Sequence, residues 1–402
     1  MSLDTGDTAF MLVATALVMI MTPGLAFFYG GLVSRKNVLT IMMQSYVSMG
    51  VTTILWVTVG YSLCFSGGAG GIIGNLDLMF LKGIGINELY PKLDIPVLLF
   101  VVYQMMFAVI TPALITGAFA NRITFKAYLI FLVAWQLLVY FPFVHMIWGG
   151  GMLAGWGALD FAGGIVVHAL AGMAALASVL YVGKRNVQDS GAHNVPFVAL
   201  GAALLWFGWF GFNAGSELAV DEITAVAFIN TQIAAAFAAI TWLLLAWNYD
   251  GKPSFVEMLI GMIAGLATIT PAAGFVSPQS AMIIGVAAGG VCYFAVVLRK
   301  KYELDDALDV WGVHGVGGAL GIVMLGVLAS TKVNANGADG LISGSTDFFV
   351  AQVSALVLAC IWAFAFTYGM LWGIDNLTPV RVTEETERNL DESLHGESAY
   401  TE

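Results

Sequence analysis

The sequence TAFMLVATALVMIMTPGLAFFYGGLV (residues 8–33) contains no charged residue and is rich in Leu, Met, Val and Phe. A helix needs about 20 consecutive apolar residues to cross the hydrocarbon core of a bilayer. The segment therefore predicts a transmembrane helix. The residues that precede it include Asp4 and Asp7 but no basic residue, which is not the pattern of a cleaved secretory signal. We expect this first helix to be retained.

The same apolar character recurs along the whole chain. Ten further segments share it: residues 39–65, 95–120, 125–144, 163–182, 195–215, 223–247, 254–271, 279–298, 308–330 and 346–373. The chain is 59% hydrophobic and 10% charged, whereas a soluble domain has about 25% charged residues. We predict an all-α integral membrane protein of eleven transmembrane helices.

Lysine and arginine are distributed unevenly between the predicted loops. The loops after the first, third, fifth, seventh and ninth segments, together with the C-terminal tail, hold twelve of the 15 basic residues. The other loops hold Lys82, Lys92 and Lys332. Since basic residues are enriched in cytoplasmic loops, we predict the N-terminus outside and the C-terminus in the cytoplasm. Ends on opposite sides require an odd number of spans.

The C-terminal tail differs in composition from the rest of the chain. Residues 1–375 form the predicted membrane domain, and residues 376–402 are polar and acidic. This composition favours a solvated cytoplasmic tail, with a docking or regulatory element as the alternative.

The net charge of the whole chain, −11, opposes binding of nucleic acid, whose phosphates attract basic surfaces. The three cysteines are scattered through apolar segments, so we expect no disulfide framework.

Two of the apolar segments share a short motif that contains histidine. VHALAG (residues 167–172) lies in the fifth segment and VHGVGG (residues 313–318) in the tenth. Segments five apart run in opposite directions, so the motif predicts that helices one to five and six to ten form an inverted repeat. Inverted repeats place equivalent helices around a shared site near the membrane midplane. We therefore expect His168 and His314 to face each other there.

Histidine within a membrane indicates a pathway for a substrate or an ion, because ionisable groups are costly there and rarely occur without a function. Removal from water disfavours the charged imidazolium, so we expect a neutral pair that shares a proton, one ring nitrogen donating and the other accepting. Metal binding is the competing role. We expect no metal, because no cysteine or carboxylate accompanies the histidines at ligand spacing.

Several long motifs resemble those of the ammonium transporter (Amt) family, in the Amt/Mep/Rh superfamily. They agree in type and order and are TPGLAFFYGGL (residues 22–32), DFAGGIVVH (160–168), GWFGFNAGS (208–216) and DVWGVHGVGG (309–318). The resemblance extends from the first helix to GESAY (396–400). It implies a homotrimer in which each subunit has its own pore for ammonium.

The resemblance also implies roles for individual residues. Trp148, Phe107 and Ser216 match an outer recruitment site for the cation, and Phe107 and Phe212 match a stacked phenylalanine gate. His168 and His314 match the twin histidines below that gate. An aromatic face attracts ammonium by a cation–π interaction, and a hydroxyl oxygen accepts one of its N–H groups.

Ordinary structural roles remain as alternatives at these positions. Trp148 is also typical of an aromatic anchor at the membrane interface, and Phe107 and Phe212 of helix packing. For Asp160, which matches a carboxylate near the outer vestibule, we favour a structural cap of the fifth helix over an electrostatic role. We expect Asp309 to cap the tenth helix in the same way.

One residue departs from the resemblance. Tyr103 stands where phenylalanine is common in the family, one turn before Phe107. We expect its hydroxyl to change the polarity of the vestibule without touching the gate.

The sequence thus predicts an ammonium transporter in the cell (plasma) membrane that takes part in nitrogen uptake. Its substrates would be ammonium or ammonia, with methylammonium as a candidate second substrate, and no cofactor is implied. An ammonium-sensing receptor of the same fold is the alternative. An enzyme is not expected, because the chain shows no nucleophile–base constellation. The tail resembles a regulatory C-terminus, which implies a cytoplasmic PII-type signal protein as a partner.

Overall fold

The structure is a computed structural model that describes residues 2–68, 70–187 and 191–400. Within these residues it is all-helical, without named strands. Ten helices are long and apolar enough to cross a membrane. They span Thr5–Leu32, Val38–Phe65, Val97–Ile115, Phe125–Gly155, Gly164–Val182, Val195–Glu217, Glu222–Asp250, Pro278–Lys301, Trp311–Leu328 and Thr346–Asp375. One shorter apolar helix, α11 (Phe255–Ile269), occupies the position of the eighth predicted segment.

Four of these spans contain π-helical turns. The second joins α2 (Val38–Leu55) and α3 (Tyr61–Phe65), and the fourth joins α5 (Phe125–Trp135) and α6 (Phe141–Ile147) and ends with α7 (Met152–Gly155). The π-helical turns at Trp56–Gly60 and Gln136–Tyr140 connect these pieces. The other two π-helical turns, η4 (Gly164–Ala169) and η6 (Trp311–Gly315), begin the fifth and tenth predicted spans and lead into α8 (Leu170–Val182) and α13 (Val316–Leu328).

Corresponding helices of the two predicted halves pack against each other. Helix α1 (Thr5–Leu32) lies against α9 (Val195–Ala214), where a Cβ atom on Gly201 would stand 2.2 Å from the backbone nitrogen of Phe28. Helix α8 and η6 make an equally close contact, which is described with the site below. Glycine lets helix backbones approach closely in a membrane, where no solvent drives association.

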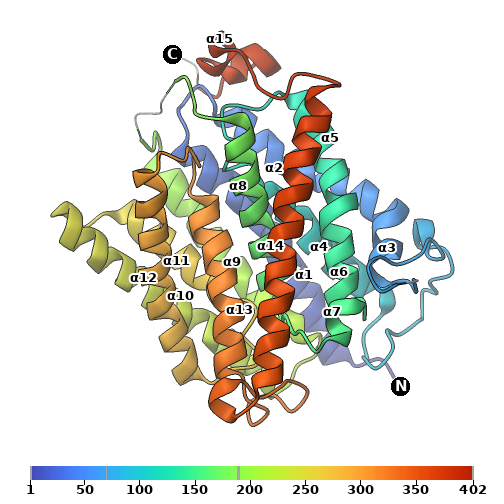
Figure 1. Ribbon diagram of the computed structural model, residues 1–402. Coiled ribbons are helices and arrows are strands. Elements are labelled where there is room, and N and C mark those ends of the chain that lie inside the picture. The colour runs from blue at the N-terminus through green and yellow to red at the C-terminus, as the bar shows by residue number, and fades with distance from the viewer. Residues whose placement is uncertain (1, 69, 188–190, 401–402) are drawn as a thin grey trace.

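The remaining helices complete one bundle. They are α4 (Val97–Ile115), α10 (Glu222–Asp250), α12 (Pro278–Lys301) and α14 (Thr346–Asp375). Large apolar side chains are exposed on the outer faces, including Leu244 at 55% and Ile361 at 63%. Such a surface suits lipid rather than water. The two ends of the chain lie at opposite ends of the bundle (Figure 1).

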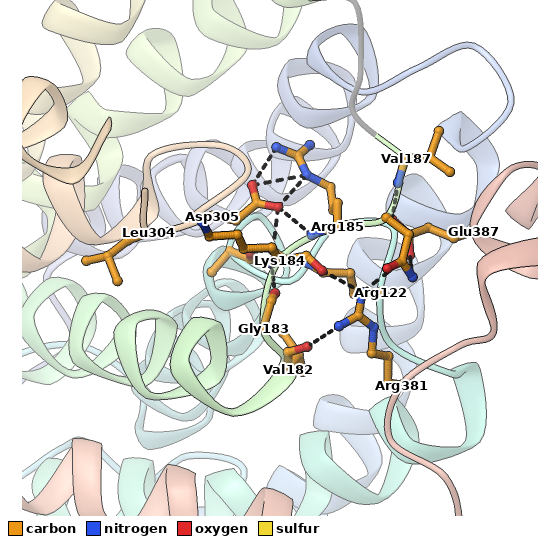
Figure 2. Close-up of polar contacts among 12 residues, drawn as sticks. Arg122, Val182, Gly183, Lys184, Arg185, Val187, Leu304, Asp305, Arg381 and Glu387 are labelled. Carbon is orange, nitrogen blue, oxygen red and sulfur yellow. Dashed lines mark hydrogen bonds and ion pairs between the residues drawn. The ribbon is translucent and has the colours of Figure 1, made fainter. Parts of the chain in front are cut away.

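Basic loops and the tail meet at the end of the bundle near the C-terminus (Figures 1 and 2). The guanidinium of Arg185 and its backbone N–H both donate to Asp305, at 2.7 Å. The buried Arg122 donates to the carbonyl of Gly183 at 2.6 Å. Burial lowers the pKa of Arg122 to about 10, and Asp305 opposes this shift. Loops after the third, fifth and ninth predicted spans thus lie on the same side, as the charge bias predicts.

The tail packs on this end of the bundle through a few buried residues, so the expectation of a solvated tail is wrong for those residues, whereas others such as Glu384 and Glu385 are exposed. The carboxylate of Glu387 accepts the backbone N–H of Val187 at 3.0 Å and lies 3.6 Å from Arg381 (Figure 2). Leu390 and Asp391 are buried. Residues 401 and 402 of the predicted tail lie outside the described residues.

Asp391 completes the start of α2. Its carboxylate accepts the backbone N–H groups of Leu39 and Thr40 at 3.0 and 2.8 Å, and the Thr40 hydroxyl at 2.8 Å. The residue that precedes α2, Asn37, provides no side-chain cap of its own. The tail therefore supplies the cap that the helix itself lacks.

We predict that Asp391→Ala loosens the tail, because loss of an N-cap costs about 0.5–2 kcal/mol. Hydrogen exchange of the backbone amides in residues 384–400 should become faster in the detergent-solubilised protein. Glu392→Ala, a change of the neighbouring exposed carboxylate, is the matched control and should leave exchange unchanged. Equal exchange in the Asp391→Ala variant and the parent protein would show that the tail is held without this contact.

Candidate functional site

A cavity of about 390 Å³ lies at the end of the bundle near the N-terminus. Phe107, Trp148 and Ser216 all line it, although they come from α4, the C-cap of α6 and the 3-10 turn that follows α9. Asp160 and Glu217 also line this cavity, which we call the outer vestibule. The structure thus brings together the residues that the sequence assigns to a recruitment site.

The aromatic wall of the outer vestibule is fixed by neighbouring groups. The Trp148 ring meets the Phe107 ring edge to face, with centroids 5.8 Å apart. The indole N–H of Trp148 donates to the carbonyl of Asp160 at 2.8 Å. The tryptophan therefore has a definite orientation, with its one hydrogen-bond donor already used.

Asp160 caps the turn that carries His168, as the sequence predicts. Its two carboxylate oxygens accept four backbone N–H groups at 2.6 to 3.1 Å, those of residues 163 to 166. The chain can fold back onto the carboxylate because Gly163 has a φ of 116°, which favours glycine. Asp160 is only 5% exposed, and these charge-assisted hydrogen bonds satisfy its carboxylate within the protein.

Phe107 and Phe212 close the inner end of the vestibule. Their rings lie 4.3 Å apart between centroids and are inclined by 36°. Both side chains are buried. The pair lies where the sequence predicts a gate, with Phe107 lining the vestibule and Phe212 lining a smaller cavity beneath it.

Tyr103 contacts Phe107, so the expectation that it does not touch the gate is wrong. Its ring lies 5.1 Å from that of Phe107, and its hydroxyl lies 2.9 Å from the carbonyl oxygen of Gly211 and 3.1 Å from that of Phe212. The residue is fully buried. Its hydroxyl is therefore used inside the protein and not in the open vestibule.

The two histidines meet edge to edge beneath Phe212. Their Nδ1 atoms are 3.3 Å apart, and their rings are nearly parallel, with centroids 5.2 Å apart and an inclination of 18°. His168 also stacks on Trp209 and Phe212, at 5.5 and 6.1 Å. Two N–H groups cannot point at each other at this distance, so the Nδ1 pair can hold one hydrogen between them.

Reciprocal glycine contacts bring the histidines together. A Cβ atom on Gly172, four residues after His168, would stand 2.0 Å from the Cα of Gly315. A Cβ atom on Gly318, four residues after His314, would stand 2.8 Å from the Cβ of His168. The two VH motifs therefore need their glycines for the helices to cross where the histidines meet.

Two small cavities continue beyond the gate. The first, of about 20 Å³, is lined mainly by apolar residues and by Phe212, His168 and His314. The next, of about 10 Å³, shares His314 and Tyr29 with the first. A space of this size holds about one water-sized molecule. The outer vestibule, the Phe107–Phe212 pair and the two histidines thus lie in sequence, and the cavities beyond the pair are small and lined mainly by apolar side chains.

The second histidine-bearing turn has a cap that the sequence analysis assigned to the wrong aspartate. Asp306, not Asp309, accepts the backbone N–H of Trp311, at 2.7 Å. Asp309 instead pairs with Arg299. Burial, with Asp309 nearby, raises the pKa of Asp306 to about 6. The spacing could have identified this cap, because Asp306 precedes His314 by eight residues, as Asp160 precedes His168.

The described residues contain no cluster of three or more His, Cys, Asp or Glu side chains that could hold a metal ion. Sequence reasoning also gave no role to the Trp209 N–H, which donates to the hydroxyl of Thr270 at 2.9 Å and holds the ring on which His168 stacks.

Comparison with known proteins agrees with this arrangement. The sequence model described as the Ammonium Transporter Family matches residues 9–400. An "Ammonium transporter" of Bacillus subtilis (strain 168) is 46% identical over 401 residues, which cover 99% of each chain. The crystal structure of Candida albicans Mep2 has a TM-score of 0.89 and 35% identity, covering 96% of this chain and 88% of that one. A structure named "Sensor Amt Protein" has a TM-score of 0.88 and 28% identity, with 96% of each chain covered.

Proposed function

The chain belongs to the ammonium transporter family, and we propose that it carries ammonium across the membrane through its own pore, from the outer vestibule past the twin histidines. It is a multi-pass membrane protein of a transporter family and not of an enzyme family. The observation that carries the proposal is the contact between the Nδ1 atoms of His168 and His314, at 3.3 Å, directly beneath an aromatic gate.

The outer vestibule would recruit the cation. The rings of Trp148 and Phe107 offer faces to a positive charge, an interaction worth up to about 2 kcal/mol when the site is dry. Ser216 lines the same space and offers an oxygen to an N–H group. Ammonium, which has four N–H donors and a positive charge, matches both features.

The gate and the cavities below it would reject hydrated metal ions. Apolar walls cannot replace the water shell of sodium or potassium. Ammonium has an alternative, because it can leave a proton behind and continue as neutral ammonia. Selectivity would then depend on deprotonation as well as on size.

The twin histidines would guide ammonia and handle the proton. The pair is buried, and its single shared Nδ1 hydrogen gives it both a donor and an acceptor character. Ammonia can accept a hydrogen bond from one ring and donate to the other as it passes. The proton would be returned to ammonia on the cytoplasmic side.

For the arrangement in the membrane, we propose eleven spans, with α11 as the eighth. The opposite positions of the two chain ends support an odd number, and the contact between η4 and η6 supports an inverted repeat. The basic loops that meet beside the tail support a cytoplasmic C-terminus. Residues 1–375 would form the transport domain of a plasma-membrane protein, and residues 376–402 its regulatory tail.

For partners, we propose a homotrimer and a PII-type signal protein at the cytoplasmic face. The family resemblance supports both, and the docked tail offers the signal protein a structured surface. Co-purification with an endogenous PII homologue from cells rich in nitrogen tests the second partner. Consistent absence of that protein would count against it.

The second candidate is an ammonium sensor of the same fold. We retain this candidate because the chain is 28% identical to the protein of the structure named "Sensor Amt Protein". The chain is more similar to proteins named as ammonium transporters, at 46% identity in Bacillus subtilis. We therefore propose transport as the main activity.

Uptake of labelled methylammonium by proteoliposomes separates the two candidates. We expect vesicles that contain the purified protein to take up label well above empty vesicles, and excess ammonium to inhibit this uptake. Binding without uptake would favour the sensor. A net current that scales with ammonium would show that the proton follows through the same pore, whereas uptake without current would show that only ammonia passes.

A further inference from the structure

Glu217 brings a carboxylate to the outer vestibule. It ends the 3-10 turn η5 (Gly215–Glu217), which follows α9, and it lines the cavity as a half-buried residue. Within the described residues, its carboxylate takes part in no hydrogen bond or ion pair. Asp160, the other carboxylate that lines the cavity, accepts four backbone N–H groups. The two carboxylates therefore differ, because only that of Asp160 is used by the fold.

No basic side chain balances the charge of Glu217 from within the cavity. Among the described residues that line the outer vestibule, none is a lysine or an arginine. Two further acidic residues, Asp221 and Glu222, follow closely in the chain at the start of α10. A cavity lined by charge of one sign has a potential of that sign. The vestibule is therefore a place that favours a cation.

Other carboxylates at this end of the bundle have structural roles. Asp4 and Asp221 are the N-caps of α1 and α10. Asp339 accepts the backbone N–H and the hydroxyl of Thr331, at 2.8 and 3.0 Å. The contacts of Glu217 give it no such role, so its charge remains available to a ligand in the cavity.

The backbone beside Glu217 is held in place. Leu218 has a φ of 63°, in the left-handed region that a leucine rarely adopts. The backbone N–H of Val220 donates to the carboxylate of Asp7 at 2.8 Å, which ties this segment to α1. The turn therefore keeps Glu217 at the cavity, although it places a leucine in an unfavourable conformation.

We propose that Glu217 determines the affinity of the outer vestibule by adding a fixed negative charge to it. The inference rests on the proposed function of this cavity. The rings of Trp148 and Phe107 and the hydroxyl of Ser216 have no net charge, so they hold a cation only at short range. A carboxylate attracts a cation over a longer distance and does not attract neutral ammonia. Glu217 thus concentrates the charged form of the substrate at the start of the path.

The test is Glu217→Gln, which removes the charge and keeps the size of the side chain. Uptake of labelled methylammonium is measured in phosphatidylcholine liposomes at about pH 8, where a carboxyl group is ionised. At low ionic strength we expect KM to rise about 3- to 10-fold, the effect of one charge about 6 Å away in a hydrated site, while the maximal rate changes less than about twofold. Glu217→Asp, which keeps the charge, should retain most of the parent affinity.

Salt separates an effect of charge from an effect of shape. The Debye length falls from about 30 Å at 0.01 M salt to about 3 Å at 1 M. Sodium chloride should therefore raise the KM of the parent protein and bring it close to that of Glu217→Gln. A change of shape would keep the two KM values apart at every salt concentration.

Glu222→Gln is the matched control, because Glu222 is an exposed glutamate at the same end of the bundle that does not line the cavity. Its KM should stay within about twofold of the parent value, since water and salt screen an exposed charge. The inference would be overturned by an unchanged KM in Glu217→Gln, by an equal rise in Glu222→Gln, or by a difference that salt does not reduce. A lost maximal rate in both Glu217→Gln and Glu217→Asp would overturn it too, because the residue would then serve the fold. No uptake by the parent protein would instead overturn the proposed function, and this inference with it.

Discussion

Replacement of either pore histidine with alanine should reduce methylammonium uptake by about 100-fold or more. We expect this because the substitution removes a group that exchanges a proton with the substrate. Positioned acid–base groups typically increase a rate by about 10²- to 10⁴-fold. His168→Ala also removes the ring that stacks on Trp209 and Phe212. Initial rates in proteoliposomes of equal protein content measure the effect.

A third buried histidine provides the control for this experiment. His145 is 5% exposed, and its ring nitrogen lies 2.9 Å from the carbonyl oxygen of Cys64, outside the proposed path. His145→Asn should keep uptake within about threefold of the parent rate. If His168→Ala and His314→Ala both retain most of the parent rate, the histidine pair is not part of the mechanism.

The second large effect is expected at Asp160, where we predict that substitution with alanine destabilises the protein by about 3–5 kcal/mol. The carboxylate accepts four backbone N–H groups in a buried place, and its removal leaves them without an acceptor. Asp160→Asn keeps one acceptor oxygen and should be intermediate. The apparent Tm in detergent, followed by tryptophan fluorescence, measures the loss.

Asp221 is the matched control for a cap. It accepts the N–H groups of Ile223 and Thr224 at the start of α10, but in a more exposed place. Asp221→Asn should lower the apparent Tm much less than Asp160→Asn. The outcome that contradicts a structural role is an Asp160→Asn protein with the parent Tm and a raised KM, because that result would make Asp160 an electrostatic attractor of the cation.

The apolar segments could be predicted well because every membrane-spanning helix must meet the same requirement of a long, mostly apolar stretch. The first predicted segment, residues 8–33, is α1, and the VH motifs do lie together. Segment ends were less accurate. The fourth predicted segment ends at residue 144, but α6 continues to Ile147, and the short helix α7 follows after a non-helical turn at residues 148–151.

Features that depend on distant contacts could not be predicted. The tail has the composition of a solvated segment, yet Asp391 is buried because the start of α2 lacks a cap of its own. The π-helical turns under both histidines depend on how the helices cross. Tyr103 was recognised as a departure, but the position of its hydroxyl depends on the backbone of α9.

The most direct test of the account is the protonation of the histidine pair itself. Solid-state ¹⁵N NMR of histidine-labelled protein in lipid at neutral pH would report each ring nitrogen of His168 and His314, assigned with single substitutions. We predict that one Nδ1 carries a hydrogen, that the other does not, and that a coupling connects them. Signals from two charged imidazolium rings, or from two rings without a shared hydrogen, would contradict the proposed mechanism.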